Sequence, residues 1–295
     1  MLYVRDPTKN HLRDHAVELA VSTLERLDFP THDPDLVVGG AQAFVVRFPD
    51  ANLCVRITFT DHVATLRGYA VSEALGPDVA LPLIQAPTKT EDATMAVFPL
   101  AQVIDDAGEA WASAINLVCA VHEHTIDPAW DVPTADPVGG LGTRLSSLES
   151  SPYHAWVPSL RKKMANLDAA AKVAARHRPH TLLHGDVHGA QAMSYQGSDL
   201  LIDFDRVARG PIEVDYGRLW AFFKEGRLEE GLFATLYENS PEDPSYGLVA
   251  TYGQMFVIRD ATWLAARSGD LGEDALWRLA SCAVALGLDL PYRAT

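Results

Sequence analysis

The chain has 295 residues, of which 48% are hydrophobic and 21% charged, and this composition excludes a disordered protein. Its formal net charge of −15 argues against nucleic acid as a partner, because the phosphate backbone requires a positive surface. The same charge fits a cationic substrate that is attracted by an acidic cleft. No apolar run reaches the roughly 18–20 residues that span a bilayer, so we expect no membrane partner.

The N-terminus and the cysteines indicate where the protein works. Residues 1–15 are polar and lack the apolar core of a signal peptide. The three cysteines, Cys54, Cys119 and Cys282, are far apart and have no metal-binding spacing. We interpret them as buried small side chains in a reducing compartment and expect a cytoplasmic protein.

The first hundred residues have the pattern of a small β-rich region with two helices. Helical spacing of apolar residues covers 11–27 and 61–75. Strand patterns lie at residues 36–38, 44–48, 53–59, 82–85 and 94–98.

After residue 100 the pattern becomes helical, apart from a Pro-, Gly- and Ser-rich stretch at 125–152 that we expect to be an irregular loop. The helical patterns lie at residues 109–124, 158–177, 215–224, 228–237, 246–268 and 273–286. This order predicts an α+β protein with a β-rich N-terminal lobe (residues 1–100) and a larger, mainly helical C-terminal lobe (residues 101–295).

Two short apolar runs within residues 181–205 are read as a pair of strands that form a hairpin through a short loop, and each run ends at an acidic residue. The first run is followed by His-Gly-Asp (184–186) and the second by Asp-Phe-Asp (203–205), with Gln191 between them. A His-Gly-Asp string alone is an ordinary turn. The second acidic turn and the amide make phosphoryl transfer the better interpretation, because that reaction needs a nucleophile-orienting group beside a magnesium site.

Each acidic residue of the motif has an expected role. Asp186 is the candidate base that accepts the proton of the substrate hydroxyl or orients it. Asp203 is the candidate magnesium ligand, and Gln191 offers a neutral oxygen to the same or a second ion. Asp205 lies on the same side as Asp203 in an extended chain and would bind metal directly or through water.

Three neighbouring residues have two interpretations each. We prefer a structural role for His184, which can fix the loop by hydrogen bonds, over a catalytic one. His188 is interpreted as a solvated loop residue or as one that faces substrate. Asp215 either complements the dipole of the helix that it begins or braces the turn at Asp186.

The N-terminal strands offer candidates for nucleotide binding. The Gly39-Gly40 turn would let backbone N–H groups approach a phosphate. Arg56, in an otherwise apolar strand, is either an edge-strand surface residue or a phosphate clamp. The downstream motif favours the clamp, because a nucleotide cleft needs a cation from this region.

Three segments, HGDVHGAQAM, LLIDFD and ARGPIEVDYGRL, resemble the aminoglycoside phosphotransferase and choline kinase-like family, which has a protein-kinase-like bilobal fold. The resemblance implies that Asp186 is the catalytic base and that Gln191 and Asp203 bind Mg²⁺. It also implies that Arg56 contacts the phosphates of ATP. The nucleotide would lie near residues 98–101, which makes Phe98 and Leu100 candidate contacts.

The chain departs from the family pattern at three positions. Gln191 stands where the family usually has Asn, and Arg56 stands where it usually has Lys, although relatives with Gln and with Arg exist. The family also places a Glu in the following helix to hold the cation. Here the aligned residue is Gly68, so either Glu73 serves through a shifted helix or the ion pair is absent.

We therefore predict an ATP- and Mg²⁺-dependent phosphotransferase that acts on a hydroxyl of a small polar molecule. The leading acceptor is an aminoglycoside-like cationic antibiotic, which would make the protein a resistance kinase. The acidic residues of segment 225–243 could supply anionic contacts to such an acceptor. The alternatives are a metabolic kinase for choline, homoserine, a sugar or a nucleoside, and a catalytically inactive nucleotide-binding module.

Overall fold

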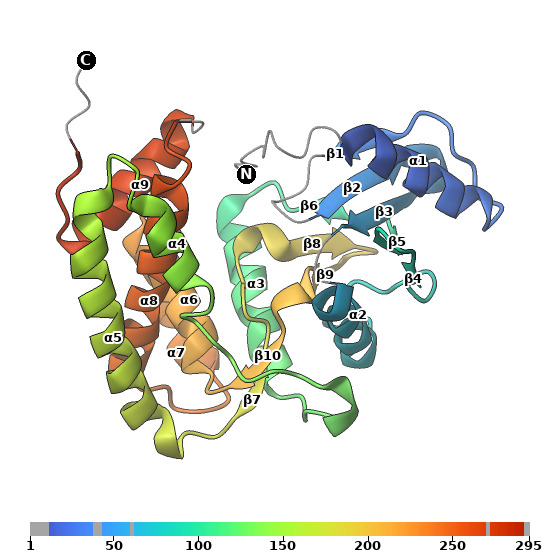
Figure 1. The fold of residues 1–295 in the computed structure, drawn as a ribbon. Helices are drawn as coiled ribbons and strands as arrows, with labels where there is room; N and C mark the ends of the chain where they lie inside the picture. The colour runs from blue at the N-terminus through green and yellow to red at the C-terminus, as the bar shows by residue number, and fades with distance from the viewer. Residues whose placement is uncertain (1–11, 38–42, 60–61, 270–271, 292–295) are drawn as a thin grey trace. The chain divides into compact units, whose positions relative to one another are not determined.

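The computed structural model describes residues 12–37, 43–59, 62–269 and 272–291 (Figure 1). The chain divides into two units, each built from separate stretches of sequence. Unit 1 consists of residues 1–117, 127–132 and 189–207, and unit 2 of residues 118–126, 133–188 and 208–295. The division of the chain into two lobes, residues 1–100 and 101–295, stays a prediction.

An antiparallel five-stranded sheet with the order β1-β2-β3-β5-β4 forms much of unit 1. The strands are β1 (Asp35–Val37), β2 (Ala43–Phe48), β3 (Leu53–Thr58), β4 (Thr88–Lys89) and β5 (Thr94–Pro99). The helices α1 (Leu12–Glu25) and α2 (His62–Leu75) belong to the same unit (Figure 1).

The core of unit 1 lies between α1 and one face of this sheet. Helix α1 contributes Ala16, Ala20 and Leu24, which recur every four residues and therefore share one side of the helix. Strand β3 contributes Val55 and Ile57 to the same cluster. Because side chains alternate along a strand, the intervening Arg56 projects from the opposite face of the sheet.

A second sheet in unit 1 contains β6 (Gln102–Val103), β8 (Ala192–Tyr195) and β9 (Ser198–Leu201). Strands β8 and β9 form a hairpin whose two turn residues, Gln196 and Gly197, both have positive φ, as tight hairpin turns require. At the open end of this hairpin the N–H of Ile202 donates to the carbonyl of Gln191 at 3.0 Å. The hairpin thus brings the residue after β9, next to Asp203, beside Gln191.

Unit 2 is mainly helical and contains one short ladder of β7 (Thr181–Leu183) with β10 (Ala208–Gly210). Its helices are α4 (Leu141–Leu148), α5 (Val157–Ala174), α6 (Glu213–Lys224), α7 (Glu230–Asn239), α8 (Tyr246–Ala265) and α9 (Glu273–Leu286). Helix α3 (Ala107–His122) begins in unit 1 and ends in unit 2. Helix α8 packs against α4, α5, α6 and α9 (Figure 1).

Glycines set the contact between α6 and α8. A Cβ atom on Gly217 would lie 2.6 Å from Cβ of Tyr252, and one on Gly253 would lie 2.2 Å from the ring of Trp220. Only glycine permits this approach, which brings the polar residues of α6 and α8 within reach of one another.

The structure confirms the α+β class, with an antiparallel sheet in the N-terminal part and a helical C-terminal part. Three expectations were wrong. Residues 82–85 form no strand, and the short β4 follows at Thr88–Lys89 instead. The stretch 125–152 contains α4, because Leu141, Leu145 and Leu148 bury one helical face.

The third error concerns pairing, because β7 and β9 do not form a hairpin with each other: β7 pairs with β10, and β9 pairs with β8. Among the described residues, no helix is both long and apolar enough to cross a membrane.

Candidate active site

The turn that carries Asp186 is fixed by a buried carboxylate in unit 2. Strand β7 ends at Leu183, and Gly185 has φ +84°, a conformation that glycine adopts without strain. The carboxylate of Asp215, in the first turn of α6, accepts hydrogen bonds from the backbone N–H groups of His184 (2.9 Å) and Gly185 (2.8 Å). These bonds set the direction in which the chain enters Asp186.

Asp215 has a second partner at the end of α3. The ring Nε2 of His122 lies 3.0 Å from Asp215 Oδ2, and both side chains are completely buried. A buried carboxylate with three donors is well satisfied, and its removal leaves those donors unpaired. The hydrogen bonds to His184 and Gly185 are the contacts expected of a residue that braces the turn at Asp186, which is the second interpretation of Asp215.

Asp186 itself is partly exposed and is held by two arginines. Its Oδ1 accepts a hydrogen bond from Arg218 Nε at 3.0 Å and contacts Arg259 Nη2 at 3.4 Å, while 25% of the side chain stays accessible. Arg218 lies on α6 and Arg259 on α8. The carboxylate is therefore oriented from two helices and still open to a ligand.

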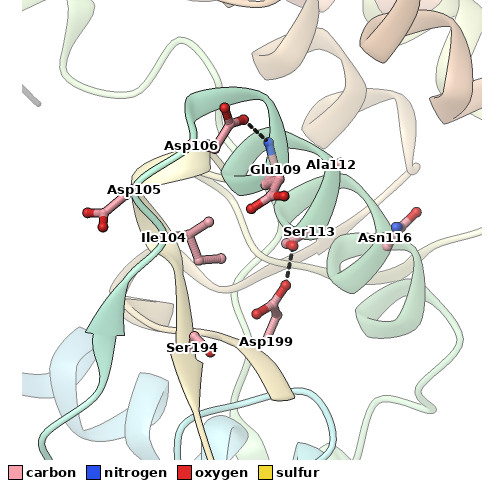
Figure 2. Close-up of a pocket in the computed structure, with 9 residues that line it drawn as sticks. All are labelled: Ile104, Asp105, Asp106, Glu109, Ala112, Ser113, Asn116, Ser194 and Asp199. Carbon is pink, nitrogen blue, oxygen red and sulfur yellow. Dashed lines mark hydrogen bonds between the residues drawn. The ribbon is translucent and has the colours of Figure 1, made fainter. Parts of the chain in front are cut away.

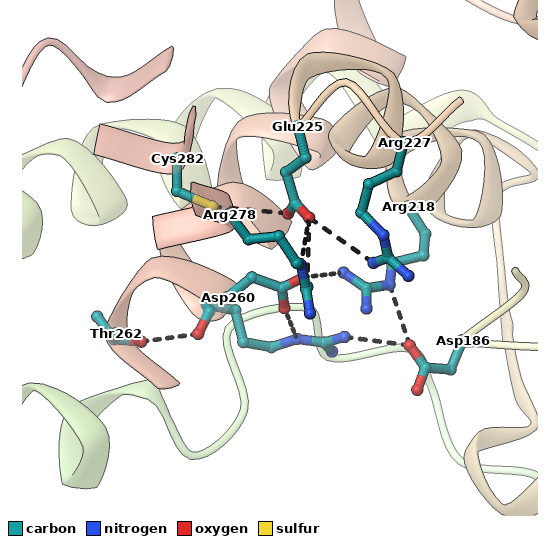
Figure 3. A network of polar contacts seen from close by, with 9 residues as sticks. Asp186, Arg218, Glu225, Arg227, Asp260, Thr262, Arg278 and Cys282 are labelled. Carbon is teal, nitrogen blue, oxygen red and sulfur yellow. Dashed lines mark hydrogen bonds and ion pairs between the residues drawn. The ribbon is translucent and has the colours of Figure 1, made fainter. Parts of the chain in front are cut away.

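The two arginines belong to a larger network of charged side chains (Figure 3). Arg218 Nη1 donates to Asp260 Oδ2 at 2.6 Å, and Arg278 approaches both Asp260 (3.7 Å) and Glu225 (3.3 Å). Burial opposes the charge of Arg218, yet Asp260 and Asp186 raise its pKa above the usual value. Burial would also raise the pKa of Asp260, but Arg218 and Arg259 hold it below the usual value.

His188 follows the Asp186 turn and is partly buried, so it is not a fully solvated loop residue. Its ring meets Phe222 edge to face at 6.0 Å between centroids. Burial lowers the pKa of His188 to about 4, and the positive charges of Arg218 and Arg227 add to this effect against the opposing charge of Asp186. His188 is therefore neutral at pH 7.

Unit 1 brings together three residues that the sequence singled out. Arg56 Nη2 lies 2.5 Å from Asp205 Oδ2 and 3.1 Å from Asp203 Oδ1, and its Nη1 donates to the hydroxyl of Tyr69 at 3.0 Å. Burial opposes the charge of Arg56, but Asp203, Tyr69 and Asp205 raise its pKa well above the usual value. Arg56 is thus a partly buried cation on a central strand, not an edge-strand surface residue.

Helix α2 has Gly68 where a glutamate partner of Arg56 would be expected. A Cβ atom at Gly68 would lie 2.7 Å from the carbonyl oxygen of Phe204, so α2 packs directly on the backbone of the Asp-Phe-Asp segment. Glu73 is exposed, and no ion pair within the described ranges joins it to Arg56. Asp203 and Asp205 supply the negative charge that the family places on the helix.

The other nucleotide-site candidates have less defined surroundings. The Phe98 ring packs on Tyr69 with 5.8 Å between centroids, and the N–H of Leu100 donates to the carbonyl of Asn52 at 2.9 Å. Phe98 therefore lies one ring away from Arg56. Gly39 and Gly40 lie outside the described residues.

The oxygen atoms near the Asp-Phe-Asp segment fit a hard cation. The Oε1 atom of Gln191 is buried and has no hydrogen-bond partner in the described part of the chain, and a buried amide oxygen of this kind is a ready ligand. Asp203 adopts a left-handed conformation (φ 68°), which is tolerated by Asp and often found at functional positions. No group of three or more His, Cys, Asp or Glu side chains in the described ranges is arranged to hold a metal by itself. Gln191, Asp203 and Asp205 therefore carry the oxygen atoms that could hold such a cation.

Unit 1 also contains a pocket whose lining includes none of these residues. It has a volume of about 590 Å³ and is lined by Asp105, Asp106, Glu109 and Asp199 together with neutral residues (Figure 2). Asp199 accepts a hydrogen bond from Ser113, and Asp106 from the backbone N–H of Glu109. None of the site residues predicted from sequence lines this pocket.

Sequence reasoning missed Arg218, Arg259, Asp260 and Tyr69. Two signals were present: Arg218 lies three residues after Asp215, on the same side of α6, and Arg259-Asp260 interrupts the otherwise apolar centre of α8. Charges in the middle of an apolar helix are buried only with partners, so they mark a polar network.

Comparisons with known proteins agree with this description. Residues 62–246, more than half of the chain, match the model of the phosphotransferase enzyme family. No curated protein matches the chain in sequence.

The solved structures share the fold. A choline/ethanolamine kinase family protein from Mesorhizobium loti has 16% identity and a TM-score of 0.67, covering 92% of this chain and 94% of that one. Choline kinase from Streptococcus pneumoniae has 14% identity and a TM-score of 0.65, covering 92% and 99%. A spectinomycin phosphotransferase in complex with ADP and spectinomycin has 15% identity and a TM-score of 0.62, covering 89% and 92%. These likenesses confirm the protein-kinase-like fold that the sequence resemblance implied.

Proposed function

We propose, from the premise that this chain belongs to the phosphotransferase enzyme family, that it transfers the γ-phosphoryl group of ATP to a hydroxyl of a small polar molecule. The observation that carries the proposal is the Asp186 carboxylate, which follows a turn fixed by Asp215 and remains 25% exposed. Phosphoryl transfer depends on such positioning of the nucleophile, because the protein supplies little covalent chemistry.

Asp186 would accept the proton of the acceptor hydroxyl or orient that hydroxyl for attack. Arg218 and Arg259 would keep the carboxylate in one orientation, since both contact the same oxygen atom. A positioned base of this kind contributes about 10²–10⁴-fold to a rate.

The unit 1 residues would hold the nucleotide and its metal ion. Gln191, Asp203 and Asp205 would bind Mg²⁺, which neutralises charge on the phosphates when bound. Arg56 already faces Asp203 and Asp205, so it would lie beside the same phosphates. Phe98 and Leu100, with Gly39 and Gly40, would complete the nucleotide site. Free thiols, with Cys119 and Cys282 buried, are consistent with a cytoplasmic location, where ATP is supplied.

Two observations on charge favour different acceptors. The net charge of −15 favours an aminoglycoside-like cation, and one structural relative is a spectinomycin phosphotransferase. Phosphorylation of such an acceptor would make the protein a resistance kinase. Two arginines, however, contact Asp186. That local charge favours a metabolic alcohol with an acidic group as the second candidate.

The test is Mg²⁺-dependent ADP release by the purified protein with a panel of aminoglycosides, choline, sugars, nucleosides and hydroxy acids. We expect one class to stimulate release and the Asp186→Asn variant to lose about 10²–10⁴-fold in kcat. Asp168→Asn, at a partly exposed residue paired with Lys172 on α5, is the matched control and should keep full activity. Stimulated turnover that survives in Asp186→Asn would contradict the assigned base. ATP binding without turnover on any acceptor would instead indicate an inactive module.

A further inference from the structure

Among the described residues, the ion-paired side chains around Asp186, several of which Figure 3 shows, include more positive than negative groups. They comprise four arginines, Arg218, Arg227, Arg259 and Arg278, and three carboxylates, Asp186, Asp260 and Glu225. With every group ionised the network keeps one positive charge. Burial, together with the negative charge of Asp260, raises the pKa of Glu225, so protonation of that residue would increase the excess.

The arginines differ in the number of carboxylates that lie within ion-pair distance. Arg218 is held by Asp186 at 3.0 Å and Asp260 at 2.6 Å. Arg227 has a single carboxylate within ion-pair distance among the described residues, Glu225 at 3.8 Å. Glu225 is fully buried and also faces Arg278 at 3.3 Å. Arg227 is therefore the least neutralised cation of the network.

Arg227 is also the most accessible of the four arginines. Its side chain is 32% exposed, compared with 8% for Arg218, 10% for Arg259 and 15% for Arg278. Burial and the like charge of Arg278 lower the pKa of Arg227 to about 10. A positive group that is destabilised by its neighbours and open to solvent gains most from a bound anion.

Phe222 places this cation next to the Asp186 turn. The guanidinium carbons of Arg218 and Arg227 lie 4.1 Å and 4.4 Å from the centre of the same ring. The ring of His188, two residues after Asp186, also packs on Phe222. One aromatic side chain thus gathers two guanidinium groups beside the candidate base, and such planar forks suit carboxylate or phosphate oxygens.

We propose that the acceptor carries, besides its reacting hydroxyl, an anionic oxygen group, carboxylate or phosphate, which Arg227 binds together with Arg218. The inference rests on the proposed function, because it treats the surroundings of Asp186 as the acceptor site. A cationic acceptor would add like charge to a network that is already positive. An anionic acceptor neutralises that excess and is held with its hydroxyl near Asp186.

The experiment uses acceptors that share a scaffold and differ in charge. Gluconate and gluconate 6-phosphate are compared with glucitol as the neutral counterpart, and glucuronate is compared with glucose and with glucosamine. Initial rates of ADP release with saturating MgATP give kcat and KM, and calorimetry gives the Kd of each compound independently of turnover. The two anions separate a preference for carboxylate from a preference for phosphate.

Three variants test the role of Arg227. Arg227→Gln removes the charge without touching Asp186 and should raise KM and Kd for anionic compounds about 10- to 100-fold, the usual effect of losing a hydrogen bond between charged groups. Arg227→Lys should restore part of this loss. Arg161→Gln removes an exposed arginine that pairs with Glu149 and should change nothing.

The outcomes separate the two proposals. The inference is supported if the parent protein prefers anionic compounds and Arg227→Gln loses this preference while it keeps kcat for them. The inference is overturned if the parent protein uses neutral or amino compounds as well as anionic ones, or better. It is also overturned if Arg227→Gln raises KM and Kd equally for all compounds. Absence of turnover with every compound contradicts the proposed function instead. Calorimetry then decides the inference, because anion binding that depends on Arg227 supports it and absence of anion binding overturns it.

Discussion

Asp215→Asn probes the support of the candidate base while it preserves the shape of the side chain. The carboxylate accepts from the N–H groups of His184 and Gly185 and faces His122 Nε2, and it is completely buried. Asparagine offers one acceptor oxygen in place of two. Whichever way the amide turns, one of the two backbone N–H groups then faces an NH₂ group and loses its partner.

The expected cost follows from these contacts. An unpaired buried N–H costs about 1–3 kcal/mol, and the remaining bond, now to a neutral oxygen, loses up to about 1 kcal/mol more. We therefore expect Asp215→Asn to lower the free energy of unfolding by about 1–4 kcal/mol. His122 can adapt by a change of tautomer, so its contact adds little to this sum.

Urea titration followed by tryptophan fluorescence measures the loss, and ADP release measures its effect on turnover. Asp168→Asn makes the same chemical change at an exposed i,i+4 pair with Lys172 and should stay within about 0.5 kcal/mol of the parent protein. If Asp215→Asn were as stable as this control, Asp215 would not be bracing the Asp186 turn.

Three further predictions concern other parts of the structure. Gly68→Ala should cost about 1–3 kcal/mol in the free energy of unfolding, because its Cβ meets the Phe204 carbonyl at 2.7 Å, whereas Gly142→Ala on α4, with open space around it, should be neutral or stabilising; equal urea midpoints for the two variants would refute the close packing. His188→Gln should make the free energy of unfolding less sensitive to acid. The pKa of His188 is about 4 in the folded protein, so its stabilising contribution is complete above about pH 6.5 and falls by up to about 3 kcal/mol as the pH drops towards 4. Parallel pH profiles of unfolding for variant and parent would contradict this. Gln191→Leu should raise the Mg²⁺ concentration for half-maximal ADP release at least about tenfold, while Gln102→Leu, on the exposed strand β6, should leave it unchanged; an unchanged Mg²⁺ requirement in Gln191→Leu would remove Gln191 from the metal site.

Local sequence patterns predicted most of the helices and the ends of the strands that matter here. Helix α2 and strand β3 were expected almost at their observed limits, because apolar spacing and turn residues mark them. The His-Gly-Asp and Asp-Phe-Asp strings were recognisable because their residue types follow apolar runs. Strand partners were not predictable in the same way, since pairing depends on contacts that local patterns do not encode. Strand β7 therefore pairs with β10 and not with the second motif strand.

The partners of the site residues were the part that sequence reasoning could not supply. Arg56 meets Asp205 across 149 positions, and α2 packs closely on the same segment at Gly68. Arg218 meets Asp260 because Gly217 and Gly253 let α6 and α8 approach. The expectation that acidic residues of segment 225–243 face a cationic acceptor stays a prediction, and Glu225 is buried against Arg278.

Phosphoryl transfer from ATP to an acceptor hydroxyl is the central claim, and product identification tests it most directly. The protein is incubated with Mg²⁺, ATP labelled in its γ-phosphate and a pool of cationic, neutral and anionic alcohols, and the label is then located by chromatography and mass spectrometry. We predict label in one class of alcohol as a phosphate ester, which Asp186→Asn forms about 10²–10⁴-fold more slowly. Label found only in inorganic phosphate, or the same ester formed at the parent rate by Asp186→Asn, would contradict the account.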